Sequence, residues 1–479
     1  MSTHSALSGR TVEADIEHTF RMQKAHALTL RTSTAEQRIA TLERLRDAVA
    51  AHEDEVVAAC HADFRKPETE ARLAELMPIY SEIKLAVANV KQWMKPEKVR
   101  PTMTMLGTSA EIRREPKGTA LIVAPWNYPF QLSIGPLVSA IAAGNTAIIK
   151  PSEMTPHVSA VVAKLIRNTF APEEVAVFEG DHHVATSLLA LPFDHIFFTG
   201  SPAVGRIVMA AAAKHLASVT LELGGKSPVI IDETAKLGKV VRHVMWGKLT
   251  NNGQTCIAPD YLYVHESQLE PFIEKARQAI HKAFGKTIED IKQSPDYCRI
   301  VNQRHFDRVL ALLEDAQSKG ARTPVGGEHD AAEQFVAPTL LTDVPPTAQI
   351  MEEEIFGPLL PVLSYTDLDR VIEEINHRPK PLALYVCSQN QDTVDRVLRQ
   401  TSAGGVCVNH TLLHYAHDKL PFGGVNNSGI GKAHGHFGFE AFSNQKPVLT
   451  DKHSAMHMFY PPYTPRVSKM LGLMLRWLN

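Results

Sequence analysis

Residues 119–150 read TALIVAPWNYPFQLSIGPLVSAIAAGNTAIIK and decide the fold class. Two short apolar runs, Thr119–Ala124 and Thr146–Lys150, enclose a longer apolar segment of helical length, Phe130–Ala143. A strand, a helix and a second strand in this order predict a βαβ unit, in which the two strands lie parallel. Both strands are nearly continuous in apolar residues, which is typical of a sheet covered by helices on both faces.

The same alternation continues along most of the chain. Strand-like apolar runs recur at 176–179, 196–199, 219–223 and 229–231, and again at 261–264, 359–365, 382–387 and 405–408. Helical segments such as Pro156–Thr169 and Asn302–Ser318 separate them. The sequence therefore predicts an α/β fold with two parallel-sheet, Rossmann-like domains. Gly224–Lys226 is the predicted hinge between the two domains.

Four segments do not follow this alternation. Residues 1–100 are predicted to be helical, since a capping-box sequence at Thr34–Gln37 precedes apolar residues at helical spacing. Residues 101–117 contain two prolines and predict an extended arm or hairpin. Residues 409–450 are polar, rich in Gly and His, and end in a predicted strand at 447–449. The apolar tail 467–478 predicts an amphipathic helix packed on the body or on a second subunit, and contact with a membrane surface is the alternative.

Composition excludes several classes of protein. A chain of 479 residues with 44% hydrophobic content and a formal net charge of −2 is a large globular protein with no bias towards nucleic acid or anionic membranes. The five cysteines are odd in number and widely spaced, which argues against a disulfide framework or a zinc site and fits a reducing compartment. No His-Glu-x-x-His motif indicates a metal, and no run approaches the ~18 apolar residues of a membrane span. Met1–Arg10 lacks the apolar core of a signal peptide, so we expect a cytoplasmic protein without a metal or a transmembrane segment.

Polar residues follow the first two predicted strands at their carboxyl ends, where open parallel sheets bind ligands. Asn127 stands between Pro125 and Pro129, which fix the backbone and aim the amide outward. An Asx turn explains an asparagine beside proline equally well. Lys150 and Glu153 follow the next strand, just before a helix.

Two further strand ends carry candidate residues. Phe198–Arg206 predicts a strand, a Gly-containing turn and a helix start, and a helix N-terminus attracts phosphate. The spacing of Gly200 and Gly205 departs from the Gly-x-Gly-x-x-Gly fingerprint, so a plain βα turn is an equally good interpretation. Glu222 lies within an apolar strand end, where a carboxyl group is either paired or raised in pKa. A raised pKa suits a general base.

Two loops complete the set. Cys256 lies in the polar loop Asn251–Pro259, and loops on a rigid scaffold often carry reactive groups. The alternative is a small buried hydrophobic residue, which is the usual role of a free cysteine. Glu352–Pro358 places an acidic cluster before a Gly-Pro turn, and its alternative is a solvated helix start.

Together these stretches resemble the NAD(P)-dependent aldehyde dehydrogenase superfamily in their order and spacing. The matching segments are Pro125–Pro129, Lys150–Glu153, Phe198–Gly205, Leu221–Gly225, Gly253–Cys256, Glu353–Pro358 and Pro421–Gly424. The resemblance covers residues 15–450. Residues 253–261 resemble the class 3 branch, which acts on fatty and aromatic aldehydes.

The resemblance implies a role for each matched residue. Cys256 corresponds to the nucleophile, Asn127 to the group that holds the oxyanion and Glu222 to the general base. The implied cofactor contacts are Lys150, Glu153, Thr199, Gly200, Ser201, Gly205, Gly224, Glu354, Phe356 and Phe422. The implied cofactor is NAD, although NADP stays open because class 3 relatives with a glutamate at the position of Glu153 use both.

The resemblance also implies a division of the chain. Residues 1–100 and 118–224 correspond to the NAD(P)-binding domain, and residues 225–408 to the catalytic domain. Residues 101–117 and 409–450 correspond to a bridging and oligomerisation arm, and residues 451–479 to a C-terminal tail. A homodimer and an aldehyde substrate are the expected partners. The histidine-rich segment His410–Asp418 is expected near the substrate channel.

Two alternatives stay open at this point. One is an enzyme that passes the acyl group to coenzyme A, although relatives of that kind typically lack the glutamate found here at Glu222. The other is a structural or binding protein that reuses the fold, because fold alone does not determine function.

Overall fold

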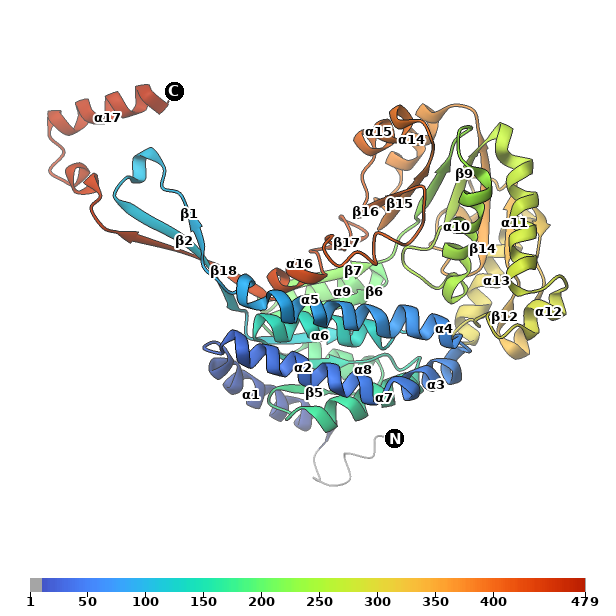
Figure 1. Cartoon of the computed structure of the whole chain (residues 1–479), viewed down its shortest axis with the longest axis horizontal. Coiled ribbons are helices and arrows are strands. Elements are labelled where there is room, and N and C mark those ends of the chain that lie inside the picture. Colours follow the sequence, from blue (N-terminus) through green and yellow to red (C-terminus); the bar gives the residue numbers. More distant parts are fainter. Residues whose placement is uncertain (1–10, 479) are drawn as a thin grey trace.

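The computed structural model describes residues 11–478, so the polar segment Met1–Arg10 lies outside the described residues. Two sheets covered by helices form the body, and a thin antiparallel arm projects from it (Figure 1). The family-level expectation of two α/β domains and a small β arm is confirmed.

The first sheet has the strand order β17-β7-β6-β3-β4-β5. Its strands are β3 (Thr119–Val123), β4 (Thr146–Lys150), β5 (Val175–Val177), β6 (His195–Gly200), β7 (Ser218–Leu223) and β17 (Gly429–Ile430). All pairings are parallel except that of β17, which returns from the far end of the sequence to pair antiparallel with β7. The strands around residues 119–150 are therefore parallel, as the sequence predicts.

Alternate residues of each strand pack against helices on opposite faces. Ile122 faces one buried cluster, and Leu121 faces the other. The first cluster includes residues of α2 (Ala35–Ala51), α3 (Glu53–Phe64), α5 (Met77–Trp93), α6 (Gln131–Ala143), α7 (Pro156–Thr169) and α16 (Gly435–Ala441). The second includes residues of α1 (Val12–Leu30), α8 (His182–Leu189) and α9 (Pro202–Ala213). Burial on both faces explains why these strands lack polar alternation.

The second sheet has the order β10-β13-β14-β9-β8-β15-β16. Its strands are β8 (Pro228–Ile231), β9 (Tyr261–His265), β10 (Arg322–Val325), β13 (Thr339–Thr342), β14 (Leu359–Tyr365), β15 (Ala383–Cys387) and β16 (Gly405–Val408). Helices α10 (Leu237–Leu249) and α11 (Leu269–Phe284) cover one face. Helices α13 (Gln303–Ser318), α14 (Leu368–His377) and α15 (Gln391–Gln400) cover the other.

The second sheet is not wholly parallel, because β10 pairs antiparallel with β13 at one edge. Neither strand is predicted from the sequence, nor is the small pair β11 (His329–Asp330) and β12 (Phe335–Val336). These strands have four residues or fewer, and prolines interrupt or border β10 and β13, so they lack the length and continuity of a strand signal.

The arm is a three-stranded antiparallel sheet of β1 (Glu97–Val99), β2 (Thr108–Pro116) and β18 (Ser443–Asp451). Its long pairing runs from Ser443 opposite Pro116 to Asp451 opposite Thr108. Only the end of the predicted arm segment 409–450 joins this sheet. The rest lies on the body, where β17 pairs with β7 and α16 contacts α5 and α6. The extent of the arm is therefore narrower at this end than predicted.

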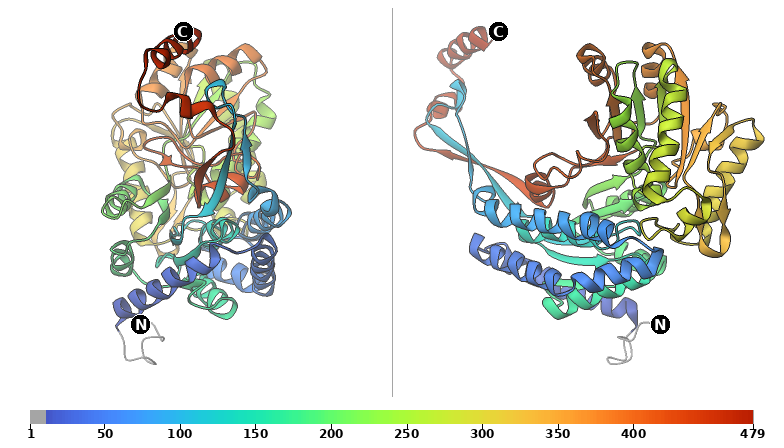
Figure 2. Two further views of the ribbon diagram at one scale, coloured as in Figure 1. Left: turned by 90° about the vertical axis from the view of Figure 1, so that its left-hand side faces the viewer. Right: turned by 45° about the vertical axis from the view of Figure 1, so that its right-hand side comes forward.

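The tail forms α17 (Pro465–Leu478), which stands beyond the arm and away from both sheets, as the right-hand view of Figure 2 shows. Leu473, Leu475 and Trp477 are 59%, 60% and 62% exposed. Packing of this helix on the body of its own chain, one of the predicted alternatives, is therefore wrong. Within residues 11–478, no helix has both the length and the apolar character needed to cross a membrane.

Candidate active site

A cavity of about 530 Å³ opens at the carboxyl ends of the first sheet, on the side that faces the second sheet and its helices. Its wall combines the ends of β3, β6 and β7 with the turn that contains Cys256 and the turn before β14. Carboxyl ends of parallel strands are the usual ligand site of such sheets. The cavity brings together these residues singled out from the sequence: Asn127, Thr199, Gly200, Ser201, Glu222, Gly224, Cys256, Glu354 and Phe356.

The turn before Cys256 has a fixed backbone. After α10 the chain passes through three left-handed residues, Asn251, Asn252 and Gly253, with φ of 53°, 54° and 73°. A Cβ on Gly253 would lie 2.2 Å from the carbonyl oxygen of Gly357, so only glycine allows the two turns to approach. Residues 254–260 then follow without regular structure, in line with the predicted loop, and contain the half-buried Cys256.

Buried amide side chains anchor the same turn. The Gln254 side chain donates to the carbonyl of Arg299 at 2.9 Å and accepts from the Val301 N–H at 3.0 Å. The Tyr128 and Thr255 hydroxyls share a hydrogen bond of 2.7 Å, which connects the end of β3 to the cysteine turn. Residues from both α/β domains therefore hold the turn that contains the Cys256 thiol.

The thiol stands among groups that disfavour its charged form. Burial raises the pKa of Cys256, and the carboxyl groups of Glu354 and Glu222 raise it further. Burial also raises the pKa of the Glu222 carboxyl to about 8, and the nearby Lys432 ammonium only partly offsets this effect. A carboxyl group with such a pKa can accept a proton near neutral pH.

Glu354 occupies a space that a glycine leaves open. A Cβ on Gly224 would lie 2.0 Å from Glu354 Oε2. Burial raises the pKa of Glu354 to about 8, and the nearby Asp260 carboxylate raises it further. Within residues 11–478, Glu354 Oε1, Glu222 Oε1 and Thr199 Oγ1 are buried without a hydrogen-bond partner. Because such atoms are costly unless satisfied, they favour a polar ligand in this cavity.

The cavity wall also contains a helix N-terminus. Ser201 caps α9 by accepting from the Val204 N–H at 3.4 Å, and the helix follows directly with Pro202. A Cβ on Gly205 would lie 2.7 Å from Leu223 Cδ2, so glycine lets α9 pack closely on β7. A close-packed helix end with free N–H groups suits phosphate. Phosphate binding here and hydroxyl binding at Glu354 fit the two ends of a nicotinamide ribose-phosphate unit.

Asn127 is buried in the segment that follows β3. Its backbone carbonyl accepts from Lys66 Nζ at 3.1 Å and from Asn251 Nδ2 at 2.9 Å. The Asn127 residue lines the cavity, and no hydrogen bond of its side-chain amide is found among residues 11–478. Its N–H₂ group is thus free to donate to a ligand.

Four predicted cofactor residues do not line this cavity, namely Gly205, Lys150, Glu153 and Phe422. Lys150 and Glu153 form an ion pair of 2.7 Å at the end of β4, further along the same sheet edge. Phe422 is buried in the second core and packs against the rings of Tyr415 and His434, at centroid distances of 4.9 and 5.3 Å. Its surroundings are those of a packing residue in this structure.

Several cavity residues have no signal in the sequence that identifies them. Arg308 on α13 lines the cavity and donates to the carbonyl of Glu354 at 3.0 Å. Lys226 donates to the carbonyls of Ile350 and Glu353, each at 2.8 Å. Both side chains hold the turn that presents Glu354. The other unpredicted residues of the wall include Trp126, His305, Arg378, Lys380 and Asn427.

Comparison with known proteins agrees with this geometry. The family model described as the aldehyde dehydrogenase family matches residues 5–448. A 4,4'-diaponeurosporen-aldehyde dehydrogenase of Staphylococcus aureus is 44% identical over 451 residues, covering 94% of this chain and 96% of the relative. Aldehyde dehydrogenase family 3 member A2 of Macaca fascicularis is 44% identical over 428 residues, covering 89% and 87%.

A solved structure described as the substrate-bound state of Staphylococcus aureus AldH superposes with a TM-score of 0.91 at 42% identity, covering 96% of this chain and 99% of that chain. The chain therefore belongs to the aldehyde dehydrogenase family, resembles its class 3 members, and is an oxidoreductase that oxidises aldehydes with NAD(P).

Proposed function

We propose that the protein converts an apolar aldehyde into its carboxylic acid through a thioester on Cys256. The single observation that carries this proposal is the convergence of Cys256, Asn127 and Glu222 on one cavity. A nucleophile, an oxyanion donor and a base are the three groups that acyl chemistry needs.

In the first step the Cys256 sulfur bonds to the aldehyde carbon, and the carbonyl oxygen becomes an oxyanion. The raised pKa of the thiol means that a base must take its proton as the bond forms. The Asn127 amide and the Cys256 N–H donate to the oxyanion. One such donor is worth about 3–4 kcal/mol at the transition state.

We assign the cofactor to the same cavity and to the adjoining sheet edge, where Lys150 and Glu153 lie. Glu354 and Thr199 would hold a ribose hydroxyl, Gly200 to Gly205 the pyrophosphate, and Lys150 with Glu153 the adenosine ribose. When bound, NAD(P)⁺ supplies the acceptor for the hydride that leaves the tetrahedral adduct. The Glu153 carboxylate disfavours a 2′-phosphate by charge repulsion, which favours NAD over NADP.

In the last step Glu222 takes a proton from water, whose oxygen attacks the thioester carbon. The Cys256 thiolate leaves, and the carboxylic acid is released. The carboxyl group of Glu222, with its pKa raised to about 8, binds that proton more readily than an ordinary glutamate does. This base favours hydrolysis over transfer of the acyl group to coenzyme A.

The surroundings of the thiol favour a medium- or long-chain aliphatic or an aromatic aldehyde. Leu412 and Tyr415 pack in the same apolar cluster as Cys256. The His410 ring stacks on the His243 ring with the two centroids 3.8 Å apart, and it makes an edge-to-face contact with the exposed Trp246 ring. We propose this face of residues 410–415 as the substrate side of the thiol.

A panel of aldehydes tests this function directly. Long-chain aliphatic and aromatic aldehydes should give a kcat/KM at least about tenfold above that of short polar aldehydes, since each buried CH₂ adds about 0.8 kcal/mol. Each aldehyde should be run with NAD and with NADP, and once with added coenzyme A. A preference for short polar aldehydes would exclude the proposed substrate class, and acyl-coenzyme A as product would favour the rival reaction.

We also propose that the arm forms a homodimer. Its outer strands β1 and β18 leave free edges, and Leu449 on β18 is 59% exposed. Free edges with apolar residues favour pairing with a second copy. Light scattering at micromolar concentration should give twice the mass of 52.9 kDa, and a monomer would contradict the proposal.

A further inference from the structure

The helical layer of the N-terminal hundred residues contains a buried ion pair beside the active site. Lys66 Nζ lies 2.6 Å from Glu75 Oε1, and both side chains are 0% exposed. Burial disfavours the ammonium, but the attraction of Glu75 outweighs this effect and leaves the pKa of Lys66 raised. A buried pair of this kind is weak evidence for stability, because the lost hydration of both charges offsets their attraction. Stability alone therefore does not explain why the Lys66–Glu75 pair is buried here.

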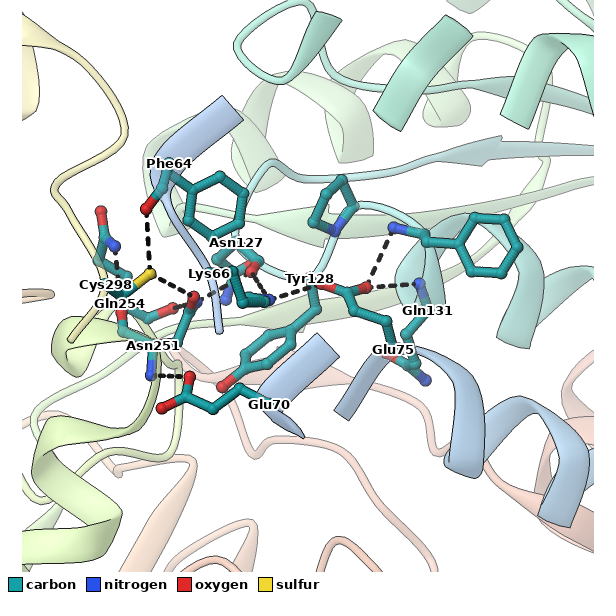
Figure 3. Close-up of polar contacts among 12 residues, drawn as sticks. Phe64, Lys66, Glu70, Glu75, Asn127, Tyr128, Gln131, Asn251, Gln254 and Cys298 are labelled. Atoms are coloured by element: carbon teal, nitrogen blue, oxygen red, sulfur yellow. Dashed lines mark hydrogen bonds and ion pairs between the residues drawn. The ribbon is translucent and has the colours of Figure 1, made fainter. Parts of the chain in front are cut away.

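Both partners of the pair hold the segment that contains Asn127. Figure 3 shows Lys66 between Glu75 and the backbone carbonyl of Asn127, to which Lys66 donates at 3.1 Å. The second oxygen of Glu75 accepts from the N–H groups of Phe130 and Gln131 at 3.2 and 2.9 Å. The pair thus holds the middle and the carboxyl end of the segment between β3 and α6, and its ammonium lies 4.2 Å from the centre of the Tyr128 ring.

A local distortion of the helix makes this arrangement accessible. Residues Arg72–Leu76 form a π-helical turn between α4 (Glu68–Ala71) and α5. On a regular α-helix, residues five apart lie roughly 140° from one another around the axis. A π-turn bonds residues five apart and brings them towards one side. Figure 3 shows Glu70 and Glu75 both facing the active-site turns.

The second side chain on the Asn127 carbonyl comes from the cysteine turn. Asn251 Nδ2 donates to Asn127 O at 2.9 Å and to Gln254 O at 3.0 Å, while the Asn251 N–H donates to Glu70 at 2.8 Å. One carbonyl oxygen therefore joins the oxyanion turn to the helical layer through Lys66 and to the nucleophile turn through Asn251 (Figure 3).

We propose that Lys66, Glu75 and Asn251 are positioning residues that fix the Asn127 amide relative to the Cys256 thiol. This inference rests on the proposed roles of Asn127 and Cys256. A donor works only when its hydrogen points at the place where the oxyanion forms, and about 1 Å of misplacement costs up to 10²-fold in rate. A turn held through its backbone keeps the Asn127 amide side chain free for substrate.

The test separates positioning from stability with two variants. Lys66→Met leaves Glu75 buried and unpaired, so the melting temperature should fall. Lys66→Met/Glu75→Gln removes both charges while an amide oxygen still accepts from the turn, so most of that loss should be recovered. In both variants the single-turnover rate of hydride transfer should be at least about tenfold below that of the unsubstituted protein. The Kd for NAD should be unchanged. Recovery of the rate together with the melting temperature would overturn the proposal.

A double-mutant cycle with Asn127→Ala shows whether the pair acts through the amide. Asn127→Ala alone should slow hydride transfer about 10²–10³-fold. In that background Lys66→Met/Glu75→Gln should slow it less than about twofold further, because coupled residues are not additive. Equal slowing in both backgrounds would overturn the positioning role and leave the proposed reaction intact. A normal rate for Asn127→Ala itself would exclude its oxyanion role, and the positioning claim would fall with it.

Two further variants test the positioning role even if the Lys66–Glu75 pair is needed for folding. Asn251→Gly keeps the left-handed backbone and the N–H to Glu70 but removes the bridging amide, so the same cycle applies. Gln23→Met is the matched control. The fully buried Gln23 side chain also bridges two carbonyls, those of Ala147 and Pro172, each at 2.9 Å. It should lower the melting temperature without slowing hydride transfer, and a slowed control would mean that any loosening of this domain suffices.

Discussion

Cys256→Ala is expected to abolish aldehyde-dependent NADH formation while the protein stays folded. The substitution removes the only sulfur atom in the cavity wall, so neither the tetrahedral adduct nor the thioester can form. Loss of a covalent nucleophile lowers kcat by about 10⁴-fold or more. The measurement is NADH absorbance under saturating aldehyde and NAD, with Kd for NAD as a check that the cofactor site is intact.

Cys407→Ala is the matched control for this variant. Cys407 is likewise free and half-buried, and burial raises the pKa of its thiol, but it lies outside the cavity wall. Its removal should change kcat by less than about twofold, as for a small packing residue. Turnover retained by the Cys256 variant, or lost equally in both variants, would remove the assignment of Cys256 as nucleophile.

Glu222→Gln is expected to separate the two halves of the reaction. A burst of one NADH per site should persist, since hydride release precedes the step that needs the base. The steady rate should then fall about 10²–10⁴-fold, the usual worth of a general base. Rapid mixing followed by absorbance measures both phases. Loss of the burst as well would mean that Glu222 acts earlier, on the thiol.

The pH dependence of deacylation follows from the same carboxyl group. A general base works in its ionised form, and burial raises the pKa of Glu222 to about 8. The ionised fraction is therefore about 10% at pH 7 and about 90% at pH 9, which predicts a rise of about ninefold in the deacylation rate. The rate for Glu222→Gln should be flat over this range.

Glu82→Gln provides the control for the pH profile. Burial raises the pKa of Glu82 to about 7, yet this residue lies outside the cavity wall, where it accepts from the Gly435 N–H at 2.9 Å. The Glu82 charge contributes to the raised pKa of Glu222, so its removal should move the midpoint of the profile slightly to lower pH and leave the size of the rise unchanged. A rise that disappears with Glu82→Gln, or that persists without Glu222, would assign the titration to another group.

The sheets were the most predictable part of the molecule. Runs such as Thr146–Lys150 are nearly continuous in apolar residues because helices cover both of their faces, and this pattern is visible in the residues themselves. Strands such as Thr339–Thr342 are not predicted, because four residues directly after a proline are too few to show the apolar run of a strand. Tail residues 467–478 were predicted to be helical, but the position of the helix depends on contacts that local sequence does not encode.

The candidate site likewise has residues that the sequence indicates and residues that it does not. The resemblance to the aldehyde dehydrogenase family singles out Cys256, Glu222 and Asn127, whereas each motif alone leaves a structural interpretation open. Lys66 and Arg308 carry no such mark, since a basic residue in or beside a helix is usually exposed to solvent. Their roles become visible only when their partners, Glu75 and the carbonyl of Glu354, are found beside them in space.

By itself, then, the sequence determined the α/β class, because strand periodicity and turn residues are local properties. Its resemblance to the aldehyde dehydrogenase family indicated the family and the residues proposed for the reaction. Only the tertiary structure decided how those groups are held. The buried carboxyl groups acquire their raised pKa values from neighbours distant in the chain, and the Asn127 carbonyl meets Lys66 and Asn251 across 61 and 124 residues. Desolvation and hydrogen-bond geometry depend on distances in space, which the order of residues along a chain does not specify.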